Sequence, residues 1–394
     1  FTTADGERWL DMAALVYQVS AGHGHRRIVD AVKAQADELA VTLPNAVYPR
    51  KTELARELLS IAPEGFSKVF FTLGGADANE NALKIARMFT GRHKVITRYR
   101  SYHGATMGAI SLSGDWRRPP VEPGLPGVVH VADFDCEHCP SGVRGPECDH
   151  EPLTRIPRAM ELEGNIGAVF VEPVVGGNGV LIPPPGYMQR LREACDAHGA
   201  LLVADEVLTG FGRTGRWLAQ EHFGVVPDMI TCGKALTGGY GTLGAVLVHD
   251  RIARYFDEHT LVAGLTGYAH PLGVAAALEA IHVYRDERLV ERAAELESVL
   301  RDGLARTQAK HRPITRQSRV IGLLSATELD VDDRQWAKLG AALRERRVLT
   351  HMVIGRPGKG QDKTLVLSPP LCISEDELSE GLDEIDLAIG EALR

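Results

Sequence analysis

Short, nearly all-apolar segments recur along most of the chain and limit the possible folds more than any other feature of the sequence. They are residues 68–73, 94–99, 127–133, 166–173, 200–207, 229–233 and 244–250. Stretches with helical spacing or many glycines separate most of them. Strands buried on both faces read as continuous apolar runs, and their alternation with helices is typical of a mostly parallel sheet covered on both sides. The sequence therefore predicts an α/β fold with a mainly parallel, seven-stranded sheet.

The pattern changes after an alanine-rich helical stretch at 271–286. Residues 288–394 combine helical segments with strands, which predicts a separate α+β domain. The length of 394 residues suits one large and one smaller domain, with a core that needs no disulfides.

Composition excludes several classes of partner. The net charge is −8 and no block of basic residues occurs, so we expect no nucleic-acid partner. No apolar run has the length of a membrane span and no signal-peptide pattern opens the chain, so we expect no membrane partner. Six cysteines in so long a chain do not indicate a disulfide framework, and we expect a cytoplasmic protein.

An acidic and a basic side chain lie at the ends of two apolar segments. The apolar run at 200–204 is followed by Asp205, and the next apolar segment leads directly to Lys234. Ligands of α/β sheets bind outside the carboxyl ends of the strands, so both side chains are expected to face one site. A lysine in a partly apolar pocket forms Schiff bases with aldehydes, and a buried aspartate can keep a pyridine nitrogen protonated. The pair indicates pyridoxal phosphate (PLP), with a solvated lysine and a strand-end acid as the alternative.

Three further segments have features of the same kind of site. A Gly-Gly turn places Gly75 and Ala76 at a helix start, where backbone N–H groups bind phosphate. Tyr102 and His103 follow the second apolar segment, where an aromatic ring can stack on a flat cofactor; the alternative is a packed loop aromatic. Glu172 ends the fourth segment, and it either orients the site or caps a neighbouring helix.

Six motifs, in their order along the chain, resemble the class III aminotransferases of PLP fold type I, the ω-aminotransferase family. They are GGADANENALKIAR, YRSYHG, VEPVVGGNGVLIPPPGY, DEVLTGFGRTG, GKAL and AHPLGVAAAL. The resemblance covers nearly the whole chain, from DGERWLDM to SPPLCISEDEL. It implies a large PLP-binding domain at 46–287 and a small α+β domain built from 1–45 and 288–394. It also implies a homodimer with its active site at the subunit interface.

The resemblance implies roles for individual residues around the cofactor ring. Lys234 would form the Schiff base with the cofactor, and Asp205 would pair with the pyridine nitrogen. Val207 would pack on one face of the ring and Tyr102 on the other, with Glu172 beneath the ring.

The same resemblance implies how the phosphate is bound. Gly75 and Ala76 would donate backbone amides to it, and Thr266 would reach it from the partner subunit. The residues after Thr266 depart from the usual family order, so the substrate-side wall is expected to differ.

A paired departure from the family bears on the substrate. Members that use 4-aminobutyrate or ornithine with 2-oxoglutarate carry a glutamate after the VEP motif and an arginine before the C-terminal PPL. These positions are Gly177 and Val366 here. Because the glutamate and the arginine are both absent, neither charge is buried without its partner. Their absence favours pyruvate as the acceptor. Arg356, in a Gly-rich loop, is the replacement carboxylate ligand by resemblance to amine:pyruvate members, with a solvated arginine as the alternative; Tyr17 is expected on the substrate side.

A cysteine-rich insertion is a second candidate site. Cys136, Cys139, Cys148 and His150 have a spacing that could hold a structural zinc ion. The alternative is a surface loop with free thiols.

The sequence thus predicts an aminotransferase that moves an amino group from a terminal primary amine or ω-amino acid to a keto acid by a ping-pong mechanism. A 2-oxoglutarate-using aminotransferase, a decarboxylase and an aminomutase of the same family remain alternatives, because all use the same lysine and aspartate. A non-catalytic scaffold with a zinc loop is the alternative from another class, and the intact pair of Asp205 and Lys234 argues against it.

Overall fold

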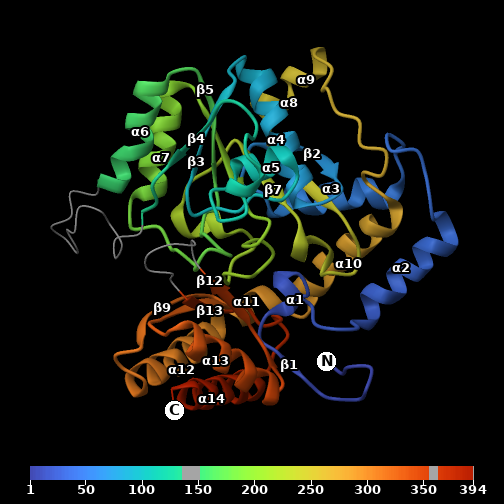
Figure 1. Cartoon of the computed structure of the whole chain (residues 1–394). Helices are drawn as coiled ribbons and strands as arrows, with labels where there is room; N and C mark the ends of the chain where they lie inside the picture. The colour runs from blue at the N-terminus through green and yellow to red at the C-terminus, as the bar shows by residue number, and fades with distance from the viewer. Residues whose placement is uncertain (135–150, 355–362, 394) are drawn as a thin grey trace.

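A seven-stranded sheet lies at the centre of the computed structural model, which describes residues 1–134, 151–354 and 363–393. The strand order is β2-β8-β7-β6-β5-β3-β4 (Figure 1). The strands are β2 (Phe66–Thr72), β3 (Lys94–Arg98), β4 (Val128–Val131), β5 (Ile166–Val171), β6 (Leu201–Asp205), β7 (Met229–Cys232) and β8 (Gly244–His249). From β4 to β7 the strands are parallel, whereas β8 runs antiparallel to both β7 and β2. The predicted mainly parallel α/β sheet is confirmed.

Alternate residues of the central strands pack on opposite faces of this sheet. In β5, Ala168 and Phe170 join a core with one helix layer, while Val169 and Val171 join the core on the other face. Every residue of β5 is buried, which explains its continuous apolar sequence. The helices that cover the two faces are α4 (Gly75–Thr90) on the first, and α6 (Glu151–Glu163) and α7 (Tyr187–His198) on the second.

A buried helix, α10 (Pro271–Asp286), supports the sheet from one side. It packs against α2 (Arg26–Leu39) and α3 (Pro49–Ile61), and Arg27 of α2 forms ion pairs with Glu279 and Asp286 of α10. The shorter helices of this part are α5 (Met107–Leu112), η1 (Pro119–Val121), η3 (Ala219–Phe223), η4 (Lys234–Thr237), α8 (Asp250–Ala253) and α9 (Tyr255–Glu258).

The C-terminal part is built on a four-stranded antiparallel sheet with the order β12-β13-β10-β9. Its strands are β9 (Thr315–Ile321), β10 (Leu324–Leu329), β12 (His351–Ile354) and β13 (Lys363–Leu367). The helices are α11 (Leu289–Glu295), α12 (Glu297–Lys310), α13 (Asp333–Glu345) and α14 (Glu375–Ala392). Figure 1 shows these elements gathered below the central sheet.

The start of the chain joins both parts. Strand β1 (Leu10–Asp11) pairs in parallel with β11 (Val348–Leu349) of the C-terminal part. Helix α2 instead lies on α10, so residues 1–45 contact both the central and the C-terminal elements. The predicted boundaries at 45 and 287 stay a prediction.

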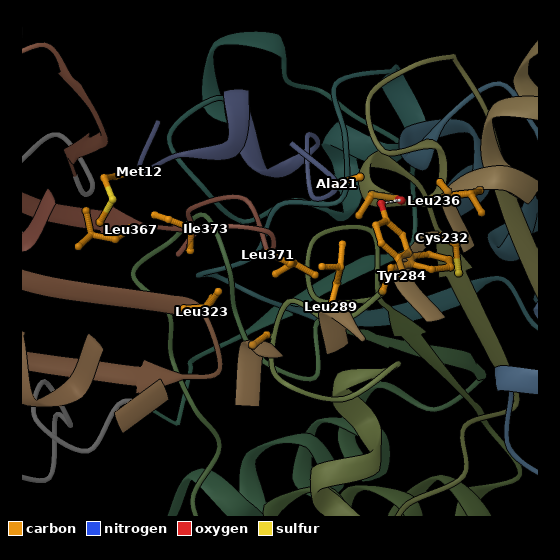
Figure 2. Close-up of a cluster of buried hydrophobic side chains, with 14 of the residues drawn as sticks. Met12, Ala21, Cys232, Leu236, Tyr284, Leu289, Leu323, Leu367, Leu371 and Ile373 are labelled. Atoms are coloured by element: carbon orange, nitrogen blue, oxygen red, sulfur yellow. Dashed lines mark hydrogen bonds between the residues drawn. The ribbon is translucent and has the colours of Figure 1, made fainter. Parts of the chain in front are cut away.

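One hydrophobic core connects the two parts. Figure 2 shows its side chains in a row, from Met12 and Leu367 beside the small sheet to Cys232 and Tyr284 beside the large one. The Tyr284 hydroxyl donates to the Ala235 carbonyl oxygen at 2.6 Å, which ties α10 to η4. This shared core fixes the C-terminal elements against the carboxyl end of the central sheet. Within the described ranges, no helix has both the length and the apolar character needed to cross a bilayer.

Candidate active site

A cavity of about 630 Å³ lies where the carboxyl ends of β5 and β6 meet the start of η4 and the strand β12. Five of the residues singled out in the sequence line it together: Lys234, Asp205, Tyr102, Glu172 and Val207. They come from four separate segments of the chain. The carboxyl ends of parallel strands meet at one edge of the sheet, which explains why these segments converge.

Lys234 is the first residue of η4 and has an unusual backbone conformation. Its φ of 40° lies in the left-handed region, which L-residues other than glycine rarely adopt. Burial lowers the pKa of its amine, whereas the nearby carboxylates of Asp205 and Glu172 partly restore it. A larger share of the amine is therefore neutral and nucleophilic than on an exposed lysine.

Asp205 ends β6 and is held by a network of side chains. Its Oδ2 atom accepts hydrogen bonds of 2.7 Å from Asn79 Nδ2 and from His103 Nδ1. Its Oδ1 atom accepts from the Val207 N–H at 3.0 Å. Asn79 is fixed in turn, because its Oδ1 accepts from the Thr231 hydroxyl at 2.8 Å. The carboxylate is 2% exposed and is kept in one orientation by donors from α4, from the loop after β3 and from its own segment.

His103 has a different position from the one that a stacking role requires. It is buried, it binds Asp205 through Nδ1, and its Nε2 lies 3.3 Å from the Thr97 hydroxyl. It is not among the residues that line the cavity. His103 therefore supports the carboxylate from behind, while Tyr102 faces the cavity.

Glu172 is buried beside the cavity and accepts two backbone hydrogen bonds. Its Oε1 accepts from the Tyr102 N–H at 3.0 Å, and its Oε2 accepts from the Gly176 N–H at 2.9 Å. Neither donor begins a helix, so this geometry suits the orienting role and not the helix cap. Burial raises the pKa of Glu172, while the imidazole of His103 acts in the opposite direction.

Gly75 and Ala76 begin α4 next to the cavity wall. A Cβ atom on Gly75 would lie 2.5 Å from Val207 Cγ1, so glycine is needed for this close approach. The first N–H groups of a helix have no partner within it and favour an anion such as phosphate. A buried amine, a fixed carboxylate and a helix start around one cavity fit PLP: Lys234, Asp205 and the start of α4 would hold it.

Thr266 lies apart from this cavity. It is exposed in the loop before α10 and does not line the cavity within one subunit. A role at the phosphate would require the loop of a second copy.

The opposite side of the cavity is formed by segments far apart in the sequence. Tyr17 lies in α1 (Ala14–Tyr17), a single turn in which every residue has positive φ. Its ring stacks on His351 of β12, with 4.4 Å between ring centroids. Gly177 lines the cavity, whereas Val366 is fully buried in the core beneath Tyr17.

Among the lining residues that the sequence interpretation did not single out, Trp116, Arg117 and His351 carry polar or aromatic side chains. Trp116 and Arg117 lie in GDWRRPP, shortly after the YHG motif. That proximity was the available signal for them, whereas His351 comes from another sheet and had none. Arg356 and the cluster of Cys136, Cys139, Cys148 and His150 lie outside the described residues. Within the described part of the chain, no group of three or more His, Cys, Asp or Glu side chains could hold a metal ion.

Comparison with known proteins places this geometry in a family. The model of the class III aminotransferases matches residues 1–389. Acetylornithine aminotransferase of Methanothermobacter thermautotrophicus is 35% identical over 391 residues, which cover 98% of this chain and 90% of that protein. Putrescine–pyruvate aminotransferase of Pseudomonas aeruginosa is 30% identical over 401 residues, which cover 96% and 85%.

A solved structure agrees in fold as well. The crystal structure of taurine:2-oxoglutarate aminotransferase from Bifidobacterium kashiwanohense, in complex with PLP and glutamate, superposes with a TM-score of 0.92. It is 36% identical, and the match covers 99% of this chain and 90% of that one. The predicted family, fold type and class of enzyme are confirmed. The chain belongs to the class III aminotransferases, which are PLP-dependent transaminases of fold type I.

Proposed function

We propose that this enzyme transfers an amino group from a terminal primary amine or ω-amino acid to a keto acid, with pyruvate as the favoured acceptor, in a ping-pong cycle of two half-reactions. The observation that carries the proposal is the presence of Lys234 and Asp205 in one cavity. The amine has a lowered pKa through burial, and the carboxylate is fixed by three hydrogen bonds.

The roles of the chain's own residues follow from their positions. PLP supplies, when bound, an aldehyde carbon and an electron-withdrawing pyridine ring. The Asp205 carboxylate, oriented by Asn79 and His103, would hold a proton on the ring nitrogen. Lys234 Nζ acts as the base that removes a proton from the substrate carbon bearing the amino group. Because burial lowers its pKa, this amine is available in the neutral form that can accept the proton.

The acceptor preference is supported by two positions on the substrate side. Gly177 brings no side chain to the cavity, and Val366 contributes an apolar side chain to the core. Neither can bind a substrate carboxylate, which favours the small acceptor pyruvate over a dicarboxylate. A 2-oxoglutarate-using enzyme is the second candidate, because the 36% identical relative from Bifidobacterium uses that keto acid.

We also propose that the enzyme acts as a homodimer. Large apolar side chains are exposed in two loops, at 70% or more of their maximal area: Val41, Leu43, Val47 and Val262. The Tyr48 hydroxyl donates to the Ala269 carbonyl oxygen at 2.8 Å and holds these loops together beside Thr266. Such a patch suits a second copy of this chain, which would place Thr266 at the other active site. Sedimentation as a monomer at micromolar concentration would contradict this.

The acceptor can be identified by following the visible absorbance of the bound cofactor through one half-reaction at a time. The enzyme is first converted to its amino form with an amine donor, and the donor is removed. Pyruvate or 2-oxoglutarate is then added separately. We expect the original absorbance to return faster with pyruvate. An equal or faster return with 2-oxoglutarate would favour the second candidate, and no change with any donor would contradict transamination.

A further inference from the structure

Building on the transamination proposed above, we propose that Arg117 binds the acidic group of the substrate and thereby selects substrates that carry a carboxylate. Arg117 lies in the loop between α5 and η1 and lines the active-site cavity. Neither the resemblance to the family nor the motifs described above assigned it a role.

Arg117 is the cation that remains available for an anionic ligand. The described basic residues that line the cavity are Lys234, Arg117 and His351. Lys234 is committed to the cofactor and to proton transfer. Burial lowers the pKa of His351, which is therefore neutral at physiological pH. The acidic lining residues, Glu172 and Asp205, are already bonded to groups of the chain itself.

The guanidinium of Arg117 is held from one edge and one face. Its Nη1 donates to Asp115 Oδ2 at 2.7 Å, and that carboxylate also accepts from the Arg117 backbone N–H at 2.9 Å. The guanidinium carbon lies 4.3 Å from the centroid of the Tyr102 ring and 5.2 Å from that of Trp116. Its Nε and Nη2 atoms make no hydrogen bond to any described residue. A planar guanidinium fixed in this way keeps free donors for a carboxylate oxygen.

The loop is placed by contacts that the sequence could not reveal. A Cβ atom on Gly114 would lie 2.2 Å from the Arg98 carbonyl oxygen, and the Gly114 N–H donates to the Ser101 carbonyl oxygen at 3.0 Å. The loop that carries Arg117 therefore lies directly against the loop that carries Tyr102. Asp115 is almost completely buried and fixes one edge of the guanidinium, whereas the Arg117 side chain itself is 43% exposed.

A purely structural role for Arg117 makes a different prediction. If the guanidinium only supports the Tyr102 ring, its removal would impair every substrate alike, because Tyr102 would face the cofactor whichever substrate is bound. If it binds an acidic group, its removal would impair only substrates that carry that group.

The test uses the PLP-loaded enzyme and two matched pairs of substrates. The donors are 4-aminobutanoate and butylamine, and the acceptors are pyruvate and acetone; in each pair a methyl group replaces the carboxylate. The half-reactions of the wild type, Arg117→Gln, Arg117→Lys and Arg118→Gln are followed separately. Arg118 is the matched control, since it pairs with Glu122 and does not line the cavity.

We expect Arg117→Gln to lower kcat/KM on the order of 10- to 100-fold for the acid-bearing member of one pair, with a change below about threefold for its acid-free counterpart. Arg117→Lys should recover part of the loss, and Arg118→Gln should behave as the wild type. A loss for 4-aminobutanoate without a loss for butylamine would show that Arg117 binds the distal acid of the donor. A loss for pyruvate without a loss for its acid-free counterpart would show that Arg117 binds the carboxylate of the keto acid.

Two outcomes would overturn the proposal in distinguishable ways. Equal losses for acid-bearing and acid-free substrates, or no loss at all, would leave transamination intact and reject Arg117 as the acid ligand. A wild-type enzyme that converts neither donor nor acceptor would reject the proposed function and this inference with it.

Discussion

The two sides of the active-site cavity are built from different kinds of structure. On the cofactor side, Asp205 and Lys234 follow buried strands of one sheet, and hydrogen bonds from α4 and the 103 loop fix the carboxylate. On the substrate side, α1, the 114–118 loop and β12 meet from distant parts of the sequence. Val16 and Trp116 on this side are 58% and 48% exposed. On the proposed assignment, the chemistry would depend on sheet geometry, whereas substrate choice would depend on segments that can change independently.

The sharpest way to test the cofactor side is Lys234→Ala. In the proposed mechanism, removing the amine would remove both the attachment to the cofactor and the base, so we expect kcat to fall roughly 10³-fold or more. Single-turnover kinetics with excess PLP would measure this loss. Lys68→Ala is the control, because Lys68 forms an exposed pair with Asp257 far from the cavity. Retention of more than a tenth of the activity in Lys234→Ala would contradict the assignment.

Asp205→Asn tests the same side with a smaller expected effect. An amide keeps the size of the side chain but loses the charge that, in the proposed mechanism, would hold a proton on the cofactor ring. We expect roughly a 10²-fold loss of kcat/KM for every donor, acid-bearing or not. Steady-state kinetics with a donor of each kind would show whether the losses are equal.

Asp228→Asn is the matched control for this prediction. Asp228 is also buried, but it lies before β7 and pairs with Arg192 and Arg251 away from the cavity. Its loss should lower the free energy of unfolding and leave the turnover of folded enzyme unchanged. A loss in Asp205→Asn confined to one class of donor would mean that the cofactor side also selects substrates.

The sequence predicted the two sides unequally well, for a physical reason. Asp205 and Lys234 could be placed together because the ends of parallel strands meet at one edge of a sheet. Arg117 could not, because its position depends on how close Gly114 approaches the 98–101 backbone. His351 could not either, since it comes from β12 in a separate sheet.

His103 shows a limit on the better-predicted side. Its place after β3 was evident from the sequence, but residues that follow a strand can turn toward the cavity or toward the core. Its neighbour Tyr102 faces the cavity, while His103 turns inward to Asp205. Local sequence does not determine which way the side chain turns. The direction is determined by the buried carboxylate of Asp205, which needs a hydrogen-bond partner.

Glu206 can test whether a buried acid on the cofactor side also affects the free energy of unfolding. Burial raises its pKa to about 7, although the Thr209 hydroxyl and the Gln220 N–H bond its carboxylate. The folded protein then holds a proton that the unfolded chain releases near its usual pKa of about 4.5. This contribution to stability is complete below that value and is lost as pH rises through about 7.

We therefore expect Glu206→Gln, which cannot ionise, to change the pH dependence of stability. The variant should match the wild type near pH 5 and exceed its free energy of unfolding by on the order of 1–3 kcal/mol near pH 8. Urea unfolding at both pH values would measure the difference. Glu258→Gln, at an exposed position, should show none. A variant that is less stable at both pH values would mean that Glu206 is ionised throughout.

The smallest effect is expected from Tyr17→Phe on the substrate side. Burial raises the pKa of the Tyr17 hydroxyl, which stays protonated and makes no hydrogen bond to a described residue. Phenylalanine keeps the stacking on His351, so kcat/KM for any amine should change by less than about threefold. Tyr17→Ala instead opens the cavity and should raise the ratio of kcat/KM for a bulky amine over a small one. A loss of tenfold or more in Tyr17→Phe would place a chemically active hydroxyl on the substrate side, and the two sides of the cavity would no longer differ in kind.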